Sequence, residues 1–289
     1  MRAFDFVSAE SADQAVSLLS EHGPNVIVLA GGTDILVDLK HAKHDPDVVV
    51  DITRADDLKG IEVNDEGLRM GALVTHTEIM DDPYIQENFP ALVHAAHTIG
   101  AVQTRNLGTL GGNLVTCVPS MDSGPALMAL EAEVTVAGPD GTRRMDLEEF
   151  FVGPRKTVLE HNEVLLDVII PKRNLGKPTD FLKFGLRKGQ ALALVNAASA
   201  LWVGEGNTFK DVKISLGAVA PTVIRAPAAE DFLEGREITP ENMAEAGRLA
   251  VEDAKPIDDF RASASYRRDL IAVLTKRTLD NAYRLAQND

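Results

Sequence analysis

Ala30-Gly31-Gly32-Thr33-Asp34 and Thr109-Leu110-Gly111-Gly112-Asn113 are the two stretches that decide the fold of this chain. Each stretch places two adjacent glycines beside residues whose side chains can donate hydrogen bonds. Because glycine has no Cβ atom, paired glycines let backbone N–H groups approach an anion closely, and Thr33, Thr109 and Asn113 add side-chain donors. The chemistry of both stretches suits a diphosphate, and a side chain introduced at Gly32 or Gly111 is expected to obstruct it.

The first stretch stands between a predicted strand and a predicted helix. Val26–Leu29 is typical of a buried strand and Ile35–Lys40 of the start of a helix, so the glycines form the turn that joins them. Neither stretch matches Gly-x-Gly-x-x-Gly or the phosphate loop that ends in Gly-Lys-Ser/Thr, so the usual nicotinamide-binding and nucleotide-hydrolysing signatures are absent. One Gly-Gly after a strand is often only a turn, but two such elements in one chain are harder to explain in this way.

The length and composition of the chain limit which classes of protein it can belong to. A chain of 289 residues with 45% hydrophobic residues predicts two globular domains with their own cores. The net charge of −15 disfavours binding to nucleic acid or to an anionic membrane surface. We expect no membrane insertion and a cytoplasmic location, because no apolar run is long enough to span a bilayer and the N-terminus lacks a signal-peptide segment.

The single cysteine, Cys117, excludes an intramolecular disulfide and a cysteine-ligated iron–sulfur cluster within this chain. A small buried apolar role is favoured for it over a reactive thiol. His94 and His97, like His41 and His44, have a spacing that metal ligands can use. Neither pair has a third ligand nearby in the sequence, so both are interpreted as incidental.

Apolar periodicity and turn residues predict the order of elements. Helices are expected at 11–19, 35–40, 90–99, 125–130, 240–254 and 263–286. Strands are expected at 26–29, 48–52, 61–63, 68–72, 134–136, 164–170, 181–186, 192–203 and 212–219. A polar segment, Arg173–Pro178, separates the two patterns, and the strands followed by helices beyond it predict an α+β layer with one antiparallel sheet.

Asp122 allows two interpretations that the residues alone leave open. Its carboxylate can accept hydrogen bonds from the ribose hydroxyls of a dinucleotide, or it can cap the helix that contains Pro125. Lys183 and Arg187 are four residues apart in a strand-like run, which places them on one face. One of them could reach a cofactor, although a solvated charged face is the simpler explanation.

The ordered series of motifs resembles the FAD-binding medium subunit of molybdenum hydroxylases, the family of the carbon monoxide dehydrogenase and xanthine dehydrogenase flavoproteins. The resemblance starts with the two glycine stretches and with Pro119-Ser120-Met121-Asp122-Ser123-Gly124-Pro125. It continues through Phe150–Thr157 and the 163–171 strand into Lys183-Phe184-Gly185-Leu186-Arg187, so it covers essentially the whole chain.

This resemblance implies an α+β fold with two units. Residues 1–175 would form an FAD-binding domain of the vanillyl-alcohol-oxidase-like (PCMH) type, with two α/β subdomains that divide near residues 55–60. Residues 178–286 would form a C-terminal α+β domain of the CO dehydrogenase flavoprotein type. The residues implied to bind FAD are Ile27, Val28, Leu29, Ala30, Gly31, Gly32, Thr33, Asp34, Ile99, Thr109, Gly111, Gly112, Asn113, Asp122, Leu165 and Lys183.

The resemblance also implies an electron-transfer flavoprotein without a catalytic side chain of its own. Electrons would come from a molybdenum cofactor in a large molybdopterin-binding subunit, through the 2Fe-2S clusters of a small subunit, to FAD in this chain and on to an external acceptor. A dimer of heterotrimers is the implied assembly. A self-contained FAD-dependent oxidase and a cofactor-free interaction scaffold are the alternative functions.

Overall fold

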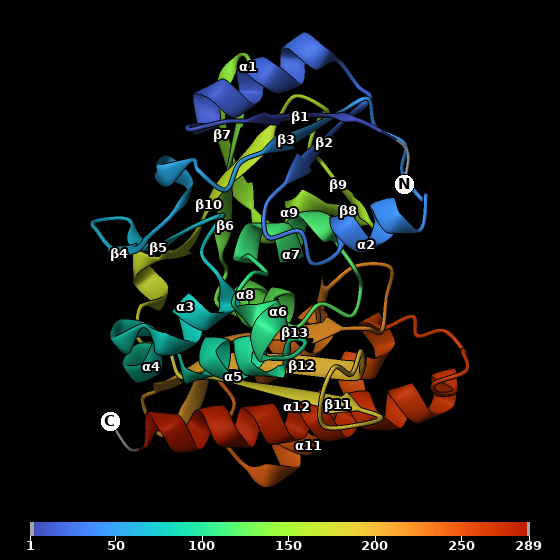
Figure 1. Cartoon of the computed structure of the whole chain (residues 1–289). Helices are drawn as coiled ribbons and strands as arrows, with labels where there is room; N and C mark the ends of the chain where they lie inside the picture. The colour runs from blue at the N-terminus through green and yellow to red at the C-terminus, as the bar shows by residue number, and fades with distance from the viewer. Residues whose placement is uncertain (1–2, 288–289) are drawn as a thin grey trace.

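A computed structural model describes residues 3–287, and its N-terminal part is a small parallel sheet (Figure 1). The strands lie in the order β1 (Asp5–Ser8), β3 (Val48–Asp51), β2 (Val26–Leu29), so β2 has one edge free of strand partners. Helices α1 (Ala12–His22) and α2 (Ile35–Lys40) connect the strands. The predicted helices and strands of this region are confirmed, and β1 is an additional strand that periodicity did not predict.

The second sheet is antiparallel and has β10 at its centre. Its order is β4 (Ile61–Val63), β5 (Gly67–Gly71), β10 (Val164–Pro171), β6 (Glu133–Gly138) and β7 (Gly141–Asp146). The predicted hairpin is confirmed as β4 and β5. β5 and β6 pair with the two edges of β10, and packing on both faces of the sheet, with α1 and α7 among the contacting helices, buries most of its side chains.

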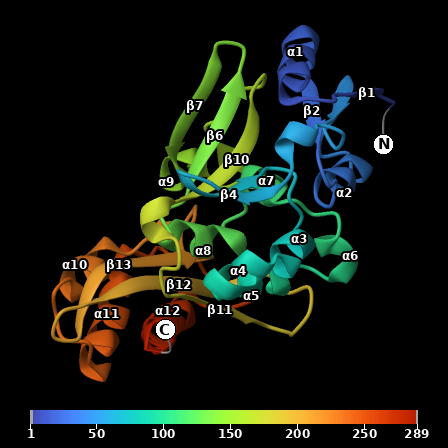
Figure 2. The same ribbon diagram turned by 90° about the vertical axis from the view of Figure 1, so that its left-hand side faces the viewer.

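Short helices fill the space beside this sheet (Figure 2). They are η1 (Asp56–Leu58), α3 (His76–Asp81), α4 (Pro83–Asn88), α5 (Pro90–Thr98), α6 (Val102–Arg105), α7 (Leu110–Thr116), α8 (Ser123–Ala129) and α9 (Leu147–Phe150). A two-stranded ribbon, β8 (Phe151–Gly153) with β9 (Lys156–Thr157), follows α9. Pro90 starts α5 where predicted, and α8 begins two residues before Pro125.

The C-terminal part is a four-stranded antiparallel sheet that lies between two layers of helices. The strands are β11 (Thr179–Gly185), β12 (Ala193–Gly204), β13 (Thr208–Gly217) and β14 (Ile224–Arg225). Helices α10 (Pro227–Leu233), α11 (Pro240–Asp253) and α12 (Ala264–Ala286) follow. Figures 1 and 2 show α12 along one face of this sheet and α5 and α8 against the other. The predicted antiparallel α+β layer is confirmed.

The segment between the second and third sheets is tightly packed. It contains η2 (Lys172–Asn174), and the side chains of Asn174 and Lys177 are fully buried. Asn174 donates to the carbonyl of Leu130, and Lys177 Nζ lies 2.8 Å from Asp211 Oδ2. Although the polar composition suggests a free linker, these residues fasten the two parts together, and the domain boundary predicted here stays a prediction. None of the helices within residues 3–287 is both long and apolar enough to cross a membrane.

Candidate cofactor site

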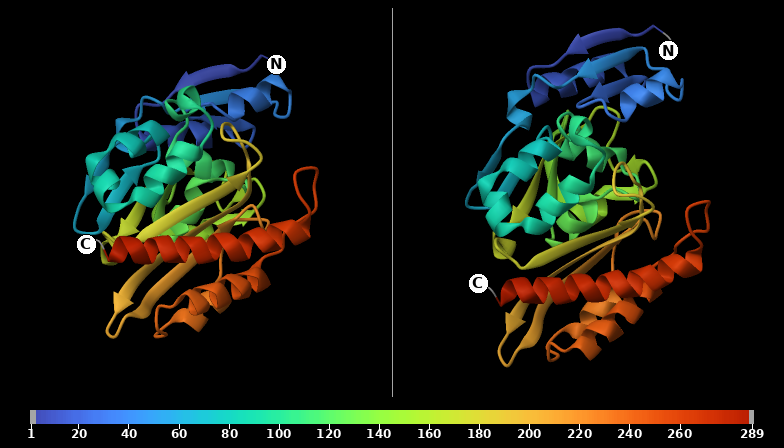
Figure 3. Two further views of the ribbon diagram at one scale, coloured as in Figure 1. Left: turned by 90° about the horizontal axis from the view of Figure 1, so that it is seen from below. Right: turned by 60° about the horizontal axis from the view of Figure 1, so that its bottom comes forward.

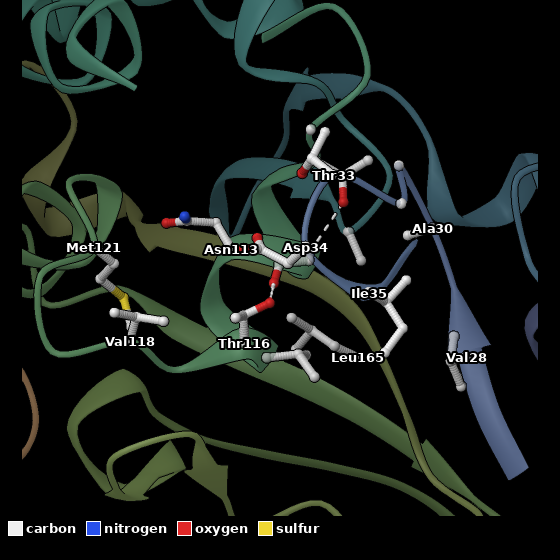
Figure 4. A pocket seen from close by; sticks show the side chains of 18 of the residues that line it. Val28, Ala30, Thr33, Asp34, Ile35, Asn113, Thr116, Val118, Met121 and Leu165 are labelled. Carbon is white, nitrogen blue, oxygen red and sulfur yellow. Dashed lines mark hydrogen bonds between the residues drawn. The ribbon is translucent and has the colours of Figure 1, made fainter. Parts of the chain in front are cut away.

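A cavity of about 890 Å³ opens between the parallel sheet, α7 and the β10 region (Figure 4). Figure 4 shows Val28 of β2, Ile35 of α2 and Leu165 of β10 facing the same space, with Asn113 and Thr116 of α7 beside them. All the residues predicted to bind the cofactor line this cavity except Leu29 and Lys183. The two glycine stretches, which are far apart in the chain, therefore meet at one site.

The first glycine stretch needs its glycines for two different reasons. A Cβ atom at Gly31 would lie 1.7 Å from the carbonyl oxygen of Leu107, so only glycine allows this close approach of two backbones. Gly32 has φ +72°, a left-handed conformation that side chains disfavour. Gly31 thus lets the first stretch pack against the segment just before the second stretch, and Gly32 makes the turn from β2 into α2.

Backbone amides of the same turn are available for a ligand. Within the described residues, the amides of Gly32, Thr33 and Asp34 donate no hydrogen bond to a protein acceptor. All three residues line the cavity. Consecutive unpaired amides form a concave anion site, and leaving them without a partner costs free energy when they are removed from water. This turn therefore fits a diphosphate.

The second glycine stretch is the first turn of α7, and its amides are already used. Thr109 Oγ1 accepts from the amide of Gly112 at 3.0 Å, which caps the helix. The amides of Leu110 and Gly111 donate to the carbonyls of Val74 and Ala72. The amides of Leu110, Gly111 and Gly112 are therefore not free to bind an anion, and binding of an anion by the amides of the first stretch stays a prediction.

Gly111 and Gly112 differ in what surrounds them. A Cβ atom at Gly111 would lie 2.7 Å from both the Cβ and the carbonyl oxygen of Ala72, so this glycine permits α7 to pack on the segment after β5. At Gly112 the same atom would meet only Thr109 Oγ1, at 2.8 Å. Gly112 is therefore the glycine of α7 whose missing side chain leaves room in the cavity.

Asn113 is the polar side chain that α7 directs toward the far end of the cavity, near Met121 (Figure 4). Its Oδ1 accepts a hydrogen bond from Ser123 Oγ at 2.5 Å. This bond orients the amide group and leaves Nδ2 as the available donor. Ser123 is buried at the start of α8, so it positions Asn113 from outside the cavity.

Asp122 is held by an ion pair and does not cap α8. Its carboxylate makes no capping hydrogen bond, so the capping interpretation is wrong. Instead Lys183 Nζ lies 2.5 Å from Oδ2, and Asn196 Nδ2 donates to Oδ1 at 2.9 Å. Burial raises the pKa of the Asp122 carboxyl, and the Lys183 ammonium opposes that rise.

Lys183 does not line the cavity and contacts the site only through Asp122. Besides Asp122 it donates to the carbonyl of Thr98 at 3.1 Å, and it is not among the cavity-lining residues. Arg187 was predicted to lie on the same strand face as Lys183. Its guanidinium instead donates to the carbonyls of Gly189 and Gln190, the residues that follow it in the chain. It thereby shapes the β11–β12 connection, whose residues 190–192 form one wall of the cavity.

His76 also lines the cavity, a position that the sequence pattern did not single out. Only 2% of its surface is exposed, and its Nδ1 has no hydrogen-bond partner among the described residues. Burial, together with the charge of Arg105, lowers the pKa of His76 to about 4, so the imidazole is neutral at pH 7. The backbone amide of His76 donates to the carbonyl of Gly108. This bond places the imidazole ring beside Gly108, just before the second glycine stretch.

A charged group on α2 forms another part of the wall that sequence reasoning missed. Asp38 is buried and accepts from Lys43 at 2.7 Å and from Arg155 at 3.2 Å. Lys43 is the main cause of the lowered pKa of the Asp38 carboxyl, and the charge of Arg155 adds to it. Arg155 lies in the β8–β9 turn, so only the tertiary structure brings it to α2.

Of the remaining candidates for chemistry, His44 lines the cavity near Asp38, whereas His94, His97 and Cys117 do not. His94 and His97 are exposed on α5, and residues 3–287 contain no cluster of three residues suited to hold a metal ion. Cys117 is buried at the end of α7, and burial raises the pKa of its thiol. A thiol in this state is a poor nucleophile.

Two family models cover nearly the whole chain. Residues 2–173 match the FAD binding domain in molybdopterin dehydrogenase, and residues 180–282 match the CO dehydrogenase flavoprotein C-terminal domain. The xanthine dehydrogenase FAD-binding subunit of Escherichia coli O157:H7 is 31% identical, with 96% of this chain and 97% of that protein aligned. The carbon monoxide dehydrogenase medium chain of Hydrogenophaga pseudoflava is 30% identical, with 97% of each aligned.

Solved structures agree with the family models. Carbon monoxide dehydrogenase from Hydrogenophaga pseudoflava superposes with a TM-score of 0.93 at 31% identity, covering 98% of both chains. Quinoline 2-oxidoreductase from Pseudomonas putida 86 gives a TM-score of 0.91 at 30% identity, covering 99% of this chain and 98% of the other. The predicted two-part FAD-binding fold is confirmed. The chain belongs to the family of FAD-binding oxidoreductase subunits of molybdopterin dehydrogenases, to which the CO dehydrogenase and xanthine dehydrogenase flavoproteins belong.

Proposed function

We propose that this chain is the electron-transfer flavoprotein subunit of a molybdenum hydroxylase complex. The observation that carries the proposal is the turn of unpaired amides at Gly32, Thr33 and Asp34, which faces a cavity of about 890 Å³ in a chain of this family. These amides would hold the FAD diphosphate. Asn113 Nδ2 and the Asp122 carboxylate would bind further polar groups of the cofactor, and β2 and Leu165 would supply apolar walls.

When bound, FAD supplies the ability to accept electrons one at a time and release them as a pair. The chain's own residues bind the cofactor, exclude water from it and set its electrostatic surroundings. Asp122 is paired, His76 is neutral and Cys117 is protonated, so none of them is prepared as an acid, base or nucleophile. This arrangement supports electron transfer without substrate chemistry in this chain.

The partners follow from the same proposal. We infer a large molybdopterin-binding subunit that hydroxylates the substrate, and a small subunit with two 2Fe-2S clusters that delivers electrons to this chain, assembled as a dimer of heterotrimers. Division of the chain into units 1–175 and 178–286, with the first divided near 55–60, is part of this proposal. A cytoplasmic location fits a chain with a single, reduced cysteine.

Reconstitution tests the proposal directly. Apoprotein is titrated with FAD, and binding is followed by the quenching of flavin fluorescence and by the absorbance of the purified product. We expect one FAD per chain, and no oxidation of small alcohols by the isolated holoprotein in air. Failure to take up FAD would leave only the scaffold function, and steady turnover of an alcohol by the chain alone would favour the self-contained oxidase.

A further inference from the structure

His76 is the first residue of α3, in the layer of short helices that lies between the N-terminal sheet and the C-terminal sheet (Figure 3). The residue lines the cofactor cavity, although it is almost fully buried. Among residues 3–287, no group forms a hydrogen bond with either nitrogen of its ring. Buried polar side chains are nearly always hydrogen-bonded, and an apolar side chain of similar size would fill this position without leaving a nitrogen unpaired. The fold itself therefore does not account for a histidine here.

Backbone hydrogen bonds fix His76 against the second glycine stretch. The amide of His76 donates to the carbonyl of Gly108 at 3.1 Å, and the amide of Leu110 donates to the carbonyl of Val74 at 2.8 Å. A capping box at Thr75 fixes the first turn of α3. The imidazole is therefore held in place before any ligand binds, which lowers the entropic cost of a contact with it.

The two ring nitrogens of His76 differ in their access to the cavity. Nδ1 is sealed from water and has no partner within the described residues. Nε2 is also unpartnered there, but it is not sealed, so a ligand in the cavity can reach this nitrogen. The ring is neutral at pH 7 and carries one proton. That proton is more stable on Nε2, where a ligand or water can accept it, than on a nitrogen that no acceptor reaches. His76 therefore offers a hydrogen-bond donor to the cavity.

This donor lies near the hydroxyl group of Thr33. A Cβ atom on Gly108 would lie 3.5 Å from His76 Cδ2, the carbon bonded to Nε2, and 3.6 Å from Thr33 Oγ1. Gly108 has no such atom, and all three residues line the cavity. In the part of the chain that the structure describes, the Thr33 hydroxyl has no hydrogen-bond partner, and the amides of Gly32, Thr33 and Asp34 have no protein acceptor. A group of donors that no protein acceptor faces is complementary to anionic oxygens.

We propose that His76 is a further binding residue for the diphosphate of FAD, to which its Nε2–H group donates a hydrogen bond. The inference rests on the proposed function, because it takes FAD to be the ligand of the cavity. The amides at the start of α7 are already used within the protein, so α3 supplies a donor that α7 does not. A neutral donor suits this position, because an imidazolium would be buried near the positive charge of Arg105.

Two amide substitutions at His76 test the hydrogen bond. The side-chain nitrogen of glutamine extends about as far from the backbone as Nε2, whereas that of asparagine extends only as far as Nδ1. FAD is titrated into each apoprotein, and binding is followed by the quenching of flavin fluorescence. His76→Asn should weaken FAD binding about tenfold to a hundredfold, and His76→Gln should stay within about threefold of the wild type. His22→Asn, at an exposed histidine of α1 outside the cavity, is the matched control and should bind as the wild type does.

A second ligand locates the bond on the cofactor. ADP carries the adenosine and a diphosphate but no flavin, so His76→Asn should weaken ADP binding, measured by calorimetry, by about the same factor as FAD binding. If His76→Asn bound ADP as the wild type does but FAD weakly, the bond would lie on the flavin side, and the proposal would be overturned.

Thermal unfolding of the apoproteins separates binding from stability. Both amides replace a buried ring by a smaller side chain, so both should lower the melting temperature to a similar extent. Equal losses of FAD affinity in the two variants, or wild-type affinity in His76→Asn, would leave His76 a structural role and overturn the proposal. Where His76→Asn does not fold, His76→Leu serves as the variant without a donor. Failure of the proposed function would be visible separately, as wild-type chain that takes up no FAD.

Discussion

Replacing Asp122 by asparagine should destabilise the protein even before FAD binds. The ion pair between Asp122 and Lys183 is buried, with side-chain exposures of 7% and 8%. Asparagine keeps the size of the side chain but removes the negative charge, so the Lys183 ammonium would remain buried without a counter-charge. Loss of one partner from a buried pair costs about 3–5 kcal/mol, and we expect a fall of about 3 kcal/mol in the free energy of unfolding because Thr98 still accepts one hydrogen bond.

The reverse substitution, Lys183→Met, should be milder. The carboxyl that it leaves unpaired can become neutral by taking up a proton, since burial already raises the pKa of Asp122. In the double variant Asp122→Asn/Lys183→Met no buried charge remains. Its loss of stability should therefore be clearly smaller than the sum of the two single losses.

Urea unfolding of the four apoproteins, followed by near-ultraviolet circular dichroism, measures this coupling. An FAD titration of the same proteins separates the second role of Asp122, because loss of its carboxylate should weaken FAD binding by about 1.5–3 kcal/mol. Unchanged stability of Asp122→Asn, or strictly additive losses in the cycle, would refute the argument that the pair is a single buried unit.

Two further predictions concern the cavity wall. Gly112→Ala should weaken FAD binding about tenfold and lower stability by at most about 1 kcal/mol, because its Cβ meets only the capping hydroxyl of Thr109. Gly111→Ala should lower stability by about 1–3 kcal/mol, because its Cβ collides with the side chain and the backbone of Ala72. A larger loss of FAD affinity in Gly111→Ala than in Gly112→Ala would contradict these assignments. The unfolded chain binds a proton at His76 below about pH 6.5, but the folded chain does so only near pH 4. The free energy of unfolding should therefore fall by about 3 kcal/mol more in the wild type than in His76→Gln as the pH drops through this window, and parallel urea-unfolding curves would show that His76 is not buried in neutral form.

Local sequence patterns predicted the regular elements well because capping and periodicity act over a few residues. Ser11 accepts from the amide of Gln14 at the start of α1, as a capping serine should. Both glycine stretches line the same cavity, and their part in cofactor binding stays a prediction. The short helices α3, α4, α6, α7, α9 and α10 were not predicted, because four to seven residues give little periodicity to distinguish a helix from a loop.

The reasons behind individual site residues depend on contacts that no local pattern contains. Gly31 must be glycine because Leu107, from another part of the chain, places its carbonyl against it. Asp122 and Lys183 were each associated with FAD by the family resemblance, but their pairing across 61 residues appears only in the folded structure. Arg155 reaches Asp38 across 117 residues for the same reason.

The central place of β10 has a consequence for synthesis of the protein. β10 joins β5 to β6, and its Asp167 pairs with Arg69, 98 residues earlier in the chain. A nascent chain on the ribosome therefore holds β5 and β6 apart, with their inner edges unpaired, until residues 164–171 emerge. Leu165 of the same strand lines the cavity, and residues 190–192 add a further wall, so the growing polypeptide can acquire its flavin only after more than half of it has been translated.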